Sequence, residues 1–221
     1  MSLHSQQPSW DPRSGWSTIS ANTFASFTLW FTGLPGTGKT TLAQLVQTAL
    51  LKRGYKVEII DTQTLSYWLK HELHIDDEIK EDRSHTPGYD AFITYICALL
   101  ARNGVITMAV SVSPHQIARS HAREQITHFI EVYLHCPDSH RHIRLQQQEE
   151  TAPIPTHLYE VPLHPELSID SSLELPERSA LRIISYIEQR GFIAPLWEEM
   201  DTTDEELTSI MARLQSLGYL D

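Results

Sequence analysis

Apolar and polar residues follow one another along this chain with two different periods, and these periods alternate. Short apolar runs rich in Val, Ile and Phe are typical of buried strands. Longer segments with an apolar residue at every third or fourth position are typical of helices that pack on one side. The short runs predict strands at residues 28–31, 57–61, 105–112, 129–134 and 167–170. The longer segments predict helices at residues 40–53, 64–73, 89–102, 115–126 and 177–189, and a further helix from residue 138.

Strands and helices that alternate in this way favour an α/β fold. Parallel strands cannot be joined by a tight hairpin and are usually connected by a helix that crosses one face of the sheet. The pattern therefore predicts a parallel sheet with helices on both faces, which is a three-layer sandwich. The helix at 40–53 has the clearest apolar stripe, made of Leu42, Leu45, Val46 and Leu50. We expect this stripe to pack on the sheet.

The two ends of the chain do not continue the alternation. Residues 1–24 are rich in Ser, Pro and Gln and predict a flexible N-terminal arm. Residues 25–193 contain all the predicted strands and form one predicted domain. Residues 194–221 are acidic and contain an apolar stripe of helical spacing, so they predict an amphipathic helical extension. Docking on its own domain is the favoured interpretation of this extension, and contact with a partner or a second copy is the alternative.

The segment between the first predicted strand and the first predicted helix has the sequence of a phosphate-binding loop. It reads Gly-Leu-Pro-Gly-Thr-Gly-Lys-Thr and fits the Walker A pattern G-x-x-x-x-G-K-[ST] at every fixed position. Glycines let backbone N–H groups approach a polyphosphate, and the following helix adds its positive end. The loop predicts a P-loop NTPase-type fold that binds ATP or GTP. The expected nucleotide-binding residues are Gly33, Leu34, Pro35, Gly36, Thr37, Gly38, Lys39, Thr40 and Thr41.

Three residues at or near this loop have side chains suited to phosphoryl transfer. In loops of this kind the lysine, here Lys39, reaches the β- and γ-phosphates, and the hydroxyl of Thr40 is a ligand of Mg²⁺. Asp61 ends the second predicted strand, on the edge where parallel sheets bind ligands. We therefore expect Asp61 to be a catalytic carboxylate and a second Mg²⁺ ligand. The alternative is that Asp61 only caps the helix that follows it.

Charge and composition argue against several other classes of function. The 221 residues include 28 acidic and 17 basic ones, giving a net charge of −11 that repels a nucleic-acid backbone. No apolar run approaches the ~18 residues that suggest a membrane-spanning helix, and the N-terminus does not have the pattern of a secretion signal. The two cysteines lie in apolar stretches and do not indicate a disulfide framework. We expect a cytoplasmic protein whose partners are small molecules, not nucleic acid or membrane.

Further motifs follow one another in a fixed order along residues 28–190. They are Leu29-Trp-Phe-Thr-Gly-Leu34, Glu81-Asp-Arg83, Asn103-Gly-Val-Ile106, Ser113-Pro114 and Tyr159-Glu-Val-Pro-Leu-His-Pro-Glu-Leu-Ser-Ile-Asp170. Over this range the chain resembles adenylylsulfate (APS) kinases. The resemblance implies transfer of the γ-phosphate of ATP, with Mg²⁺, to the 3′-hydroxyl of adenosine 5′-phosphosulfate, a step of sulfate assimilation. It also implies a homodimer, because members of this family are often dimers.

The resemblance further implies residues that hold the anionic acceptor. They are Arg83, Ser113, Pro114, Arg119 and Arg123. A planar guanidinium suits phosphate and sulfate groups. For the arginines, a solvated surface ion pair is the alternative. By analogy with nucleoside kinases of this architecture, Arg141 is expected to be a lid arginine that contacts ATP, with an ordinary surface charge as its alternative.

The chain departs from the APS kinase pattern at the positions nearest to the chemistry. Where the family has Asp-Gly-Asp followed by an arginine, this chain has Asp61, Gln63 and Ser66. Gln63 remains a candidate catalytic residue because an amide can orient a hydroxyl, but it cannot accept a proton as a carboxylate does. Two or three arginines that the family places near the nucleotide are missing. The lid segment at 142–155 also lacks the family's Lys-Gly-Leu-Tyr.

These departures leave three hypotheses. In the first, the protein is an active APS kinase that tolerates Gln63 and an altered acceptor pocket. In the second, it is a kinase of the same fold that acts on another small hydroxyl compound. In the third, it binds nucleotide without turnover. The resemblance favours them in that order.

Overall fold

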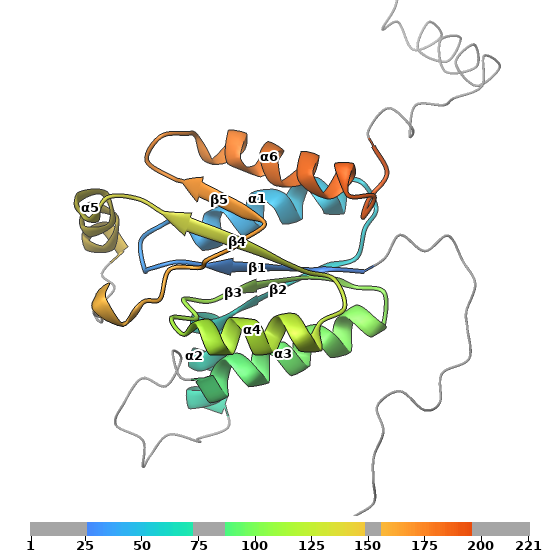
Figure 1. Ribbon diagram of the computed structural model, residues 1–221, viewed down its shortest axis with the longest axis horizontal. Helices are drawn as coiled ribbons and strands as arrows, with labels where there is room; N and C mark the ends of the chain where they lie inside the picture. The colour runs from blue at the N-terminus through green and yellow to red at the C-terminus, as the bar shows by residue number, and fades with distance from the viewer. Residues whose placement is uncertain (1–25, 73–86, 149–155, 196–221) are drawn as a thin grey trace, which may run out of the picture.

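The computed structural model describes residues 26–72, 87–148 and 156–195, and Figure 1 shows how their elements are arranged. Within these ranges a five-stranded sheet has the order β2-β3-β1-β4-β5, and every pair of neighbouring strands is parallel. The strands are β1 (Thr28–Thr32), β2 (Val57–Asp61), β3 (Ile106–Val110), β4 (Phe129–His135) and β5 (Leu167–Asp170). The predicted N-terminal arm and nearly all of the predicted C-terminal extension lie outside the described residues.

Helices cover both faces of the sheet. They are α1 (Lys39–Lys52), α2 (Thr62–Glu72), α3 (Pro87–Arg102), α4 (Gln116–Gln125), α5 (Asp138–Gln148) and α6 (Pro176–Gln189), with a short 3-10 helix η1 (Thr156–Leu158). Figure 1 shows α1 and α6 on one face, α2, α3 and α4 on the other, and α5 beyond the end of β4. This arrangement confirms the predicted three-layer α/β sandwich. No helix of the described ranges is both long enough and apolar enough to cross a membrane.

The central strand β1 explains how both layers of helices are held. All its residues are buried, and successive side chains point to opposite faces, as they do in any strand. Leu29 and Phe31 belong to the core under α1 and α6, together with Leu42 of α1. Trp30 belongs to the core under α3 and α4, where its ring lies 5.6 Å from that of Phe129. The predicted apolar stripe of the first helix therefore packs on the sheet, as expected.

The largest difference from the predicted elements is at the end of β3. The sequence predicts a strand through residue 112, but the strand ends at Val110. The chain then turns, and Ser113 has a φ of 43°, the single positive φ found outside glycine in the described part of the chain. A residue in this left-handed region cannot continue a strand. The apolar run continues past Val110 because the turn itself is buried, so the apolar pattern alone does not mark the strand end.

The last described residues are held against the end of α1 by Arg53. Its Nη2 lies 2.6 Å from a carboxylate oxygen of Glu188 in α6 and also donates to the carbonyl oxygen of Ala194 at 3.2 Å. The hydroxyl of Tyr55 accepts the N–H of Ala194 at 3.1 Å. The ion pair is nearly buried, since the two side chains are 7% and 14% exposed. Arg53 therefore fixes α6 and the chain that follows it.

We expect Arg53→Ala to lower the free energy of unfolding by about 2–3 kcal/mol, because Glu188 and the Ala194 carbonyl lose a charged donor in a nearly buried place. Urea unfolding followed by circular dichroism measures this change. Arg182→Ala is the matched control, since Arg182 is 47% exposed and pairs with Glu174; its loss should cost below ~1 kcal/mol. Equal losses of unfolding free energy in the two variants would contradict the role of Arg53 in fixing α6.

Candidate functional site

The loop between β1 and α1 is held closely against β4 and α5. Gly33 and Gly36 have φ values of 147° and 79°. A Cβ atom at Gly33 would lie 2.2 Å from the carbonyl oxygen of Leu134, and one at Gly36 would lie 2.9 Å from that of Arg141. Glycine is thus required here by packing against neighbouring backbone, and its conformational freedom also lets the loop approach a phosphate. The loop predicted from the sequence can therefore bring its backbone close to a phosphate group.

Lys39 lies within the loop. Its Nζ donates to the carbonyl oxygens of Gly33 at 2.9 Å and Leu34 at 3.0 Å, and the residue is 9% exposed. The hydroxyl of Thr37 also donates to the Leu34 carbonyl, at 2.9 Å. The ammonium group therefore lies where the bound phosphates are expected. Phosphate oxygens can replace the loop carbonyls as its partners with little movement of the side chain.

Asp61 caps the helix that follows it, which is one of the two roles that the sequence analysis left open, and it also contacts the loop. Its Oδ1 accepts the backbone N–H groups of Gln63 at 2.9 Å and Thr64 at 3.2 Å, so Asp61 caps α2. Its Oδ2 accepts the hydroxyl of Thr40 at 3.1 Å, which joins the end of β2 to the start of α1. Gln63 is exposed in the first turn of α2. The cap thus fixes the carboxylate in the position that joins it to the loop.

The Thr40–Asp61 pair fits a Mg²⁺ site. Mg²⁺ prefers oxygen ligands and usually takes one or two protein oxygens, with water and substrate phosphates completing its shell. A hydroxyl and a carboxylate in contact at the end of the loop supply those oxygens. Within the described ranges, no cluster of three or more His, Cys, Asp or Glu side chains forms a metal site made of protein ligands alone.

Two arginines of α5 bond to the loop from the outside. Arg141, which is 4% exposed, donates to Asp138 at 2.7 Å and to the carbonyl oxygen of Pro35 at 3.3 Å. Arg144 donates to the carbonyl oxygen of Gly36 at 3.2 Å. The hydrogen bond from Arg141 lowers the pKa of the Asp138 carboxyl below its ordinary value. The arginine predicted to contact ATP therefore lies against the loop, where it supports the loop backbone.

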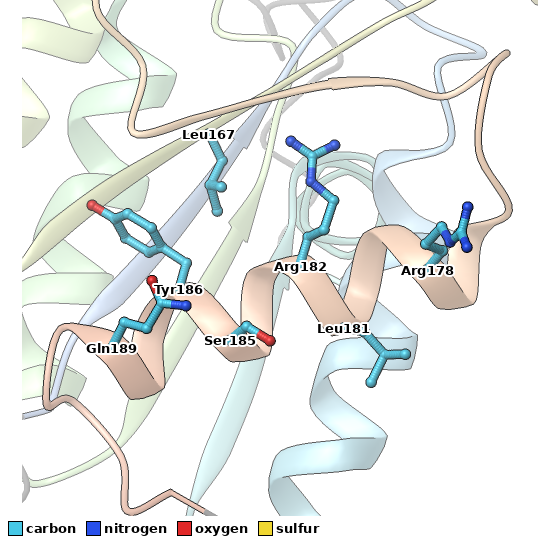
Figure 2. A pocket seen from close by; sticks show the side chains of 7 residues that line it. All are labelled: Leu167, Arg178, Leu181, Arg182, Ser185, Tyr186 and Gln189. Carbon is cyan, nitrogen blue, oxygen red and sulfur yellow. The ribbon is translucent and has the colours of Figure 1, made fainter.

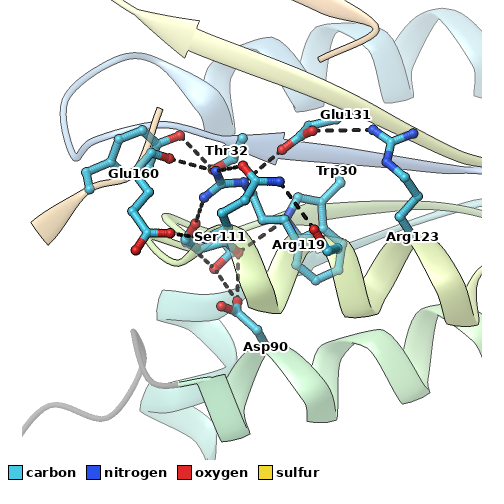
Figure 3. Close-up of polar contacts among 12 residues, drawn as sticks. Trp30, Thr32, Asp90, Ser111, Arg119, Arg123, Glu131 and Glu160 are labelled. Atoms are coloured by element: carbon cyan, nitrogen blue, oxygen red, sulfur yellow. Dashed lines mark hydrogen bonds and ion pairs between the residues drawn. The ribbon is translucent and has the colours of Figure 1, made fainter. Parts of the chain in front are cut away.

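Three of the predicted acceptor residues, Ser113, Pro114 and Arg119, are buried and lie close together. Figure 3 shows Arg119 among its polar contacts. Arg119 is 1% exposed and donates to the carbonyl oxygens of Ser113 and Glu160, both at 2.6 Å. Its Nε lies 2.8 Å from a carboxylate oxygen of Glu131 in β4. The guanidinium therefore joins the end of β3, strand β4 and the segment after η1. Its contacts are with the protein itself.

The other two predicted acceptor arginines lie elsewhere. Arg123, which is 39% exposed, has a carboxylate oxygen of Glu166 2.5 Å from its Nη1 and one of Glu131 3.3 Å from its Nη2. Its guanidinium also stacks 4.8 Å from the ring centre of Phe129. This is the ion-pair arrangement that the sequence analysis named as the alternative. Arg83 lies outside the described residues.

Asp90 is a residue of this network that the sequence analysis did not single out. It lies at the start of α3 and is fully buried. Its Oδ1 accepts the hydroxyls of Ser113 at 2.7 Å and Ser111 at 3.2 Å, while its Oδ2 is buried without a hydrogen-bond partner. The indole N–H of Trp30 donates to the Ser113 hydroxyl oxygen at 3.2 Å. Burial raises the pKa of Asp90 to about 6. We call Trp30, Asp90, Ser111, Ser113 and Arg119 the Ser113 network.

A sequence signal for Asp90 does exist. Asp90 falls on the same apolar stripe of its helix as Ile93 and Cys97, which are both fully buried. A charged residue within a buried stripe needs partners from other parts of the chain. The partners, however, come from β3 and its following turn, and helical spacing does not identify them.

A shallow depression lies away from these residues, between β5 and the outer face of α6 (Figure 2). It is lined by Leu167, Arg178, Leu181, Arg182, Ser185, Tyr186 and Gln189. None of these residues belongs to the predicted site. The depression is therefore separate from the phosphate-binding loop and from the Ser113 network.

Comparison with known proteins gives a consistent result. Residues 25–170 match the model of the adenylylsulphate kinase family. An adenylyl-sulfate kinase of Halothermothrix orenii is 35% identical over 175 residues, which are 75% of this chain and 91% of that protein. A probable adenylyl-sulfate kinase of Pyrococcus abyssi is 34% identical over 176 residues, covering 76% of this chain and 98% of that protein.

The fold also matches a solved structure. The APS kinase of Mycobacterium tuberculosis, in complex with AMPPNP and APS, superimposes with a TM-score of 0.60 at 24% sequence identity. The match covers 74% of this chain and 98% of that protein. At this identity the likeness supports the fold.

Asp90 should make stability depend on pH. Its pKa is raised from 3.8 to about 6 in the folded state, so its contribution is fully present below pH 3.8 and is lost as the pH rises through 6. Asp90→Asn removes this ionisation. Between pH 4 and pH 7 we expect the wild type to lose roughly 2–3 kcal/mol of unfolding free energy relative to Asp90→Asn. Urea titrations at both pH values measure the difference, and parallel pH profiles would contradict it.

Proposed function

The chain belongs to the adenylylsulphate kinase family, and we propose that it transfers the γ-phosphate of ATP to the 3′-hydroxyl of adenosine 5′-phosphosulfate. Family membership confirms the resemblance found in the sequence and the prediction of a kinase. The observation that carries the proposal is the phosphate-binding loop with Lys39 inside it and Thr40 bonded to Asp61. These residues supply the donor half of a phosphotransferase.

On the donor side, the loop N–H groups and Lys39 bind the phosphates of ATP and hold the γ-phosphate in line for transfer. Thr40 and Asp61 would hold Mg²⁺, which when bound would neutralise negative charge on the phosphate oxygens. Arg141 and Arg144 keep the loop in shape through the carbonyl groups of Pro35 and Gly36. The shape of the donor site thus depends on these arginine–carbonyl hydrogen bonds.

On the acceptor side, Gln63 takes the place of the family's second aspartate. Asp61 caps α2 and so fixes the first turn in which Gln63 lies. An amide oxygen in this position can accept a hydrogen bond from the attacking hydroxyl and so orient that hydroxyl. Phosphoryl transfer through a loose transition state depends mainly on positioning and charge, so orientation supplies much of the catalysis. Turnover without a carboxylate at this position is consistent with that chemistry.

A second candidate is a kinase of the same fold that acts on a different small hydroxyl compound. The observation that favours it is the engagement of Arg119 and Arg123 with Glu131 and Glu166. Guanidinium groups paired with the protein's own carboxylates are poor ligands for a second anion, because binding it would break those pairs. An acceptor with less negative charge than adenosine 5′-phosphosulfate would suit such a site.

The remaining predictions belong to the same proposal. We propose that the enzyme works in the cytoplasm as a homodimer, with Mg²⁺ and ATP and without nucleic-acid or membrane partners. The division into an arm at 1–24, a kinase domain at 25–193 and an amphipathic extension at 194–221 also stays a prediction.

Purified protein supplied with ATP, Mg²⁺ and adenosine 5′-phosphosulfate should form 3′-phosphoadenylylsulfate, detected by chromatography. Lys39→Ala should lower kcat/KM by about 100-fold or more, because a charge that stabilises the transferring phosphoryl group is lost. Intact ATP binding with no product would exclude an APS kinase. Turnover of another hydroxyl compound would then support the second candidate, and turnover of none would support nucleotide binding alone.

Gln63→Asp should raise kcat by about tenfold or more if the missing carboxylate limits the reaction, since general-base catalysis contributes that much or more. Gln63→Asn is the matched control because it shortens the side chain without adding a carboxylate, and it should give no gain. A steady-state assay with adenosine 5′-phosphosulfate measures both. No gain from aspartate would place the limiting defect in the acceptor pocket.

A further inference from the structure

Asp90 lowers the stability of the folded state because one of its carboxylate oxygens is buried without a partner, a cost that a residue with a purely structural role need not have. Its Oδ1 accepts two serine hydroxyls, but its Oδ2 is buried without a partner. A buried carboxylate that is only half satisfied disfavours folding, because the lost hydration is not fully replaced. An uncharged polar residue of similar size would satisfy the serines without this cost. Such a conflict between local stability and residue type is typical of a residue kept for function.

The group that Asp90 holds is strained. Ser113 has a φ of 43°, a conformation that costs about 1 kcal/mol or more for a residue with a side chain. Each of its polar groups is bonded within the Ser113 network. The hydroxyl donates to Asp90 and accepts from Trp30, the N–H donates to the Ser111 hydroxyl oxygen at 3.2 Å, and the carbonyl accepts from Arg119. Asp90 supplies the charged acceptor among these contacts.

This strained turn forms part of the carboxyl edge of the sheet. It leads directly into α4, and the carbonyl oxygen of Pro114 accepts the N–H of Glu160 at 2.9 Å. On the other side, the hydroxyl of Tyr89 donates to the carbonyl oxygen of Thr62 at 3.2 Å, which places the start of α3 beside the start of α2. Asp90 thus lies between the turn before α4 and the helix that carries Gln63. Figure 3 shows its second oxygen directed away from the serines.

We propose that Asp90 is a positioning residue for the acceptor substrate: its carboxylate holds the Ser113 turn in the strained conformation that shapes the acceptor side of the site. Asp90 is buried and does not touch the acceptor itself. The proposal rests on the proposed kinase function. It predicts that changes at Asp90 weaken the use of the acceptor and leave the use of ATP unchanged.

In this proposal the ionised carboxylate of Asp90, and not its protonated form, holds the Ser113 turn. The groups that face it are the hydroxyls of Ser111 and Ser113 from β3 and its turn, Arg119 from α4, and His115 at the start of α4. Burial raises the pKa of Asp90 and outweighs the two serine hydroxyls, Arg119 and His115, which lower it. The KM for the acceptor should therefore rise as the pH falls below about 6.

The test compares Asp90→Ala and Asp90→Asn with Thr94→Val. Thr94 is a matched control, since it is buried one turn along the same helix and donates to the backbone carbonyl of Asp90 at 2.7 Å. Asp90→Ala should raise the KM for adenosine 5′-phosphosulfate about tenfold, the effect expected for losing a charged hydrogen bond, and should leave the KM for ATP within about twofold. Thr94→Val should leave both unchanged. Unfolding free energies are measured for all variants.

The pH profile provides a second readout. Asp90→Asn has nearly the same shape, so it keeps the test open if Asp90→Ala does not fold. At pH 7.5, Asp90→Asn should raise the KM for the acceptor less than Asp90→Ala does. Between pH 7.5 and pH 5, Asp90→Asn should show no further rise in this KM. His115→Gln removes one of the groups that lower the pKa of Asp90, so this variant should still show the rise in acceptor KM, starting at a pH no lower than in the wild type.

The outcomes distinguish the inference from the function on which it rests. Wild type that makes no 3′-phosphoadenylylsulfate overturns the proposed function and this inference together. Wild type that is active, with Asp90→Ala showing an unchanged acceptor KM, overturns the inference alone. The same follows if Thr94→Val raises the acceptor KM as much as Asp90→Ala, or if Asp90→Asn keeps the wild-type pH profile.

Discussion

The carboxyl edge of the sheet depends on the guanidinium of Arg119. This one group contacts the end of β3 through Ser113, strand β4 through Glu131, and the segment after η1 through Glu160. Glu131 and Arg119 are both nearly fully buried, at 3% and 1% exposure. Removing Glu131 would leave the charge of Arg119 buried without its carboxylate partner, which is far more costly than never having the pair. The acceptor side of the site is built around this constraint.

The two halves of the site are held by different kinds of contact. The donor half is local: the loop and the first turn of α1 are continuous in sequence, and Asp61 reaches them from the neighbouring edge of the sheet. The acceptor half brings together β1, β3, β4, α3 and α4 through a few buried polar side chains. Polar networks of this kind are sensitive to each member, because a partly satisfied network is less stable than a fully satisfied one. We therefore expect a single substitution in this network to disturb several of its members at once.

This difference explains what the sequence could predict. The loop could be read from the sequence because its glycines, Lys39 and Thr40 lie within one short segment, and its role in binding nucleotide stays a prediction. The role of Asp61 was left open between a cap and a Mg²⁺ ligand; the structure shows the cap and a hydrogen bond from Thr40, and the role as a ligand stays a prediction. Asp90 was missed because its partners, Ser111 and Ser113, lie in the turn after β3 and not in its own helix. The end of β3 was misplaced because a buried turn is as apolar as a buried strand.

The charge balance around the Ser113 network bears on the acceptor that we propose. The N-terminus of α4 would attract an anion, but Glu160 already fills this place: its carboxylate accepts the N–H of Gln116 at 2.6 Å. Arg119 is engaged with Glu131, and the nearby Asp90 adds a further negative charge when ionised. The described acceptor side is therefore nearly neutral, although the donor side is positive. If the acceptor is the doubly charged one that we propose, Arg119 and Arg123 are already paired with carboxylates, and the geometry of the Ser113 turn then has a larger effect on binding than it would beside a row of unpaired arginines.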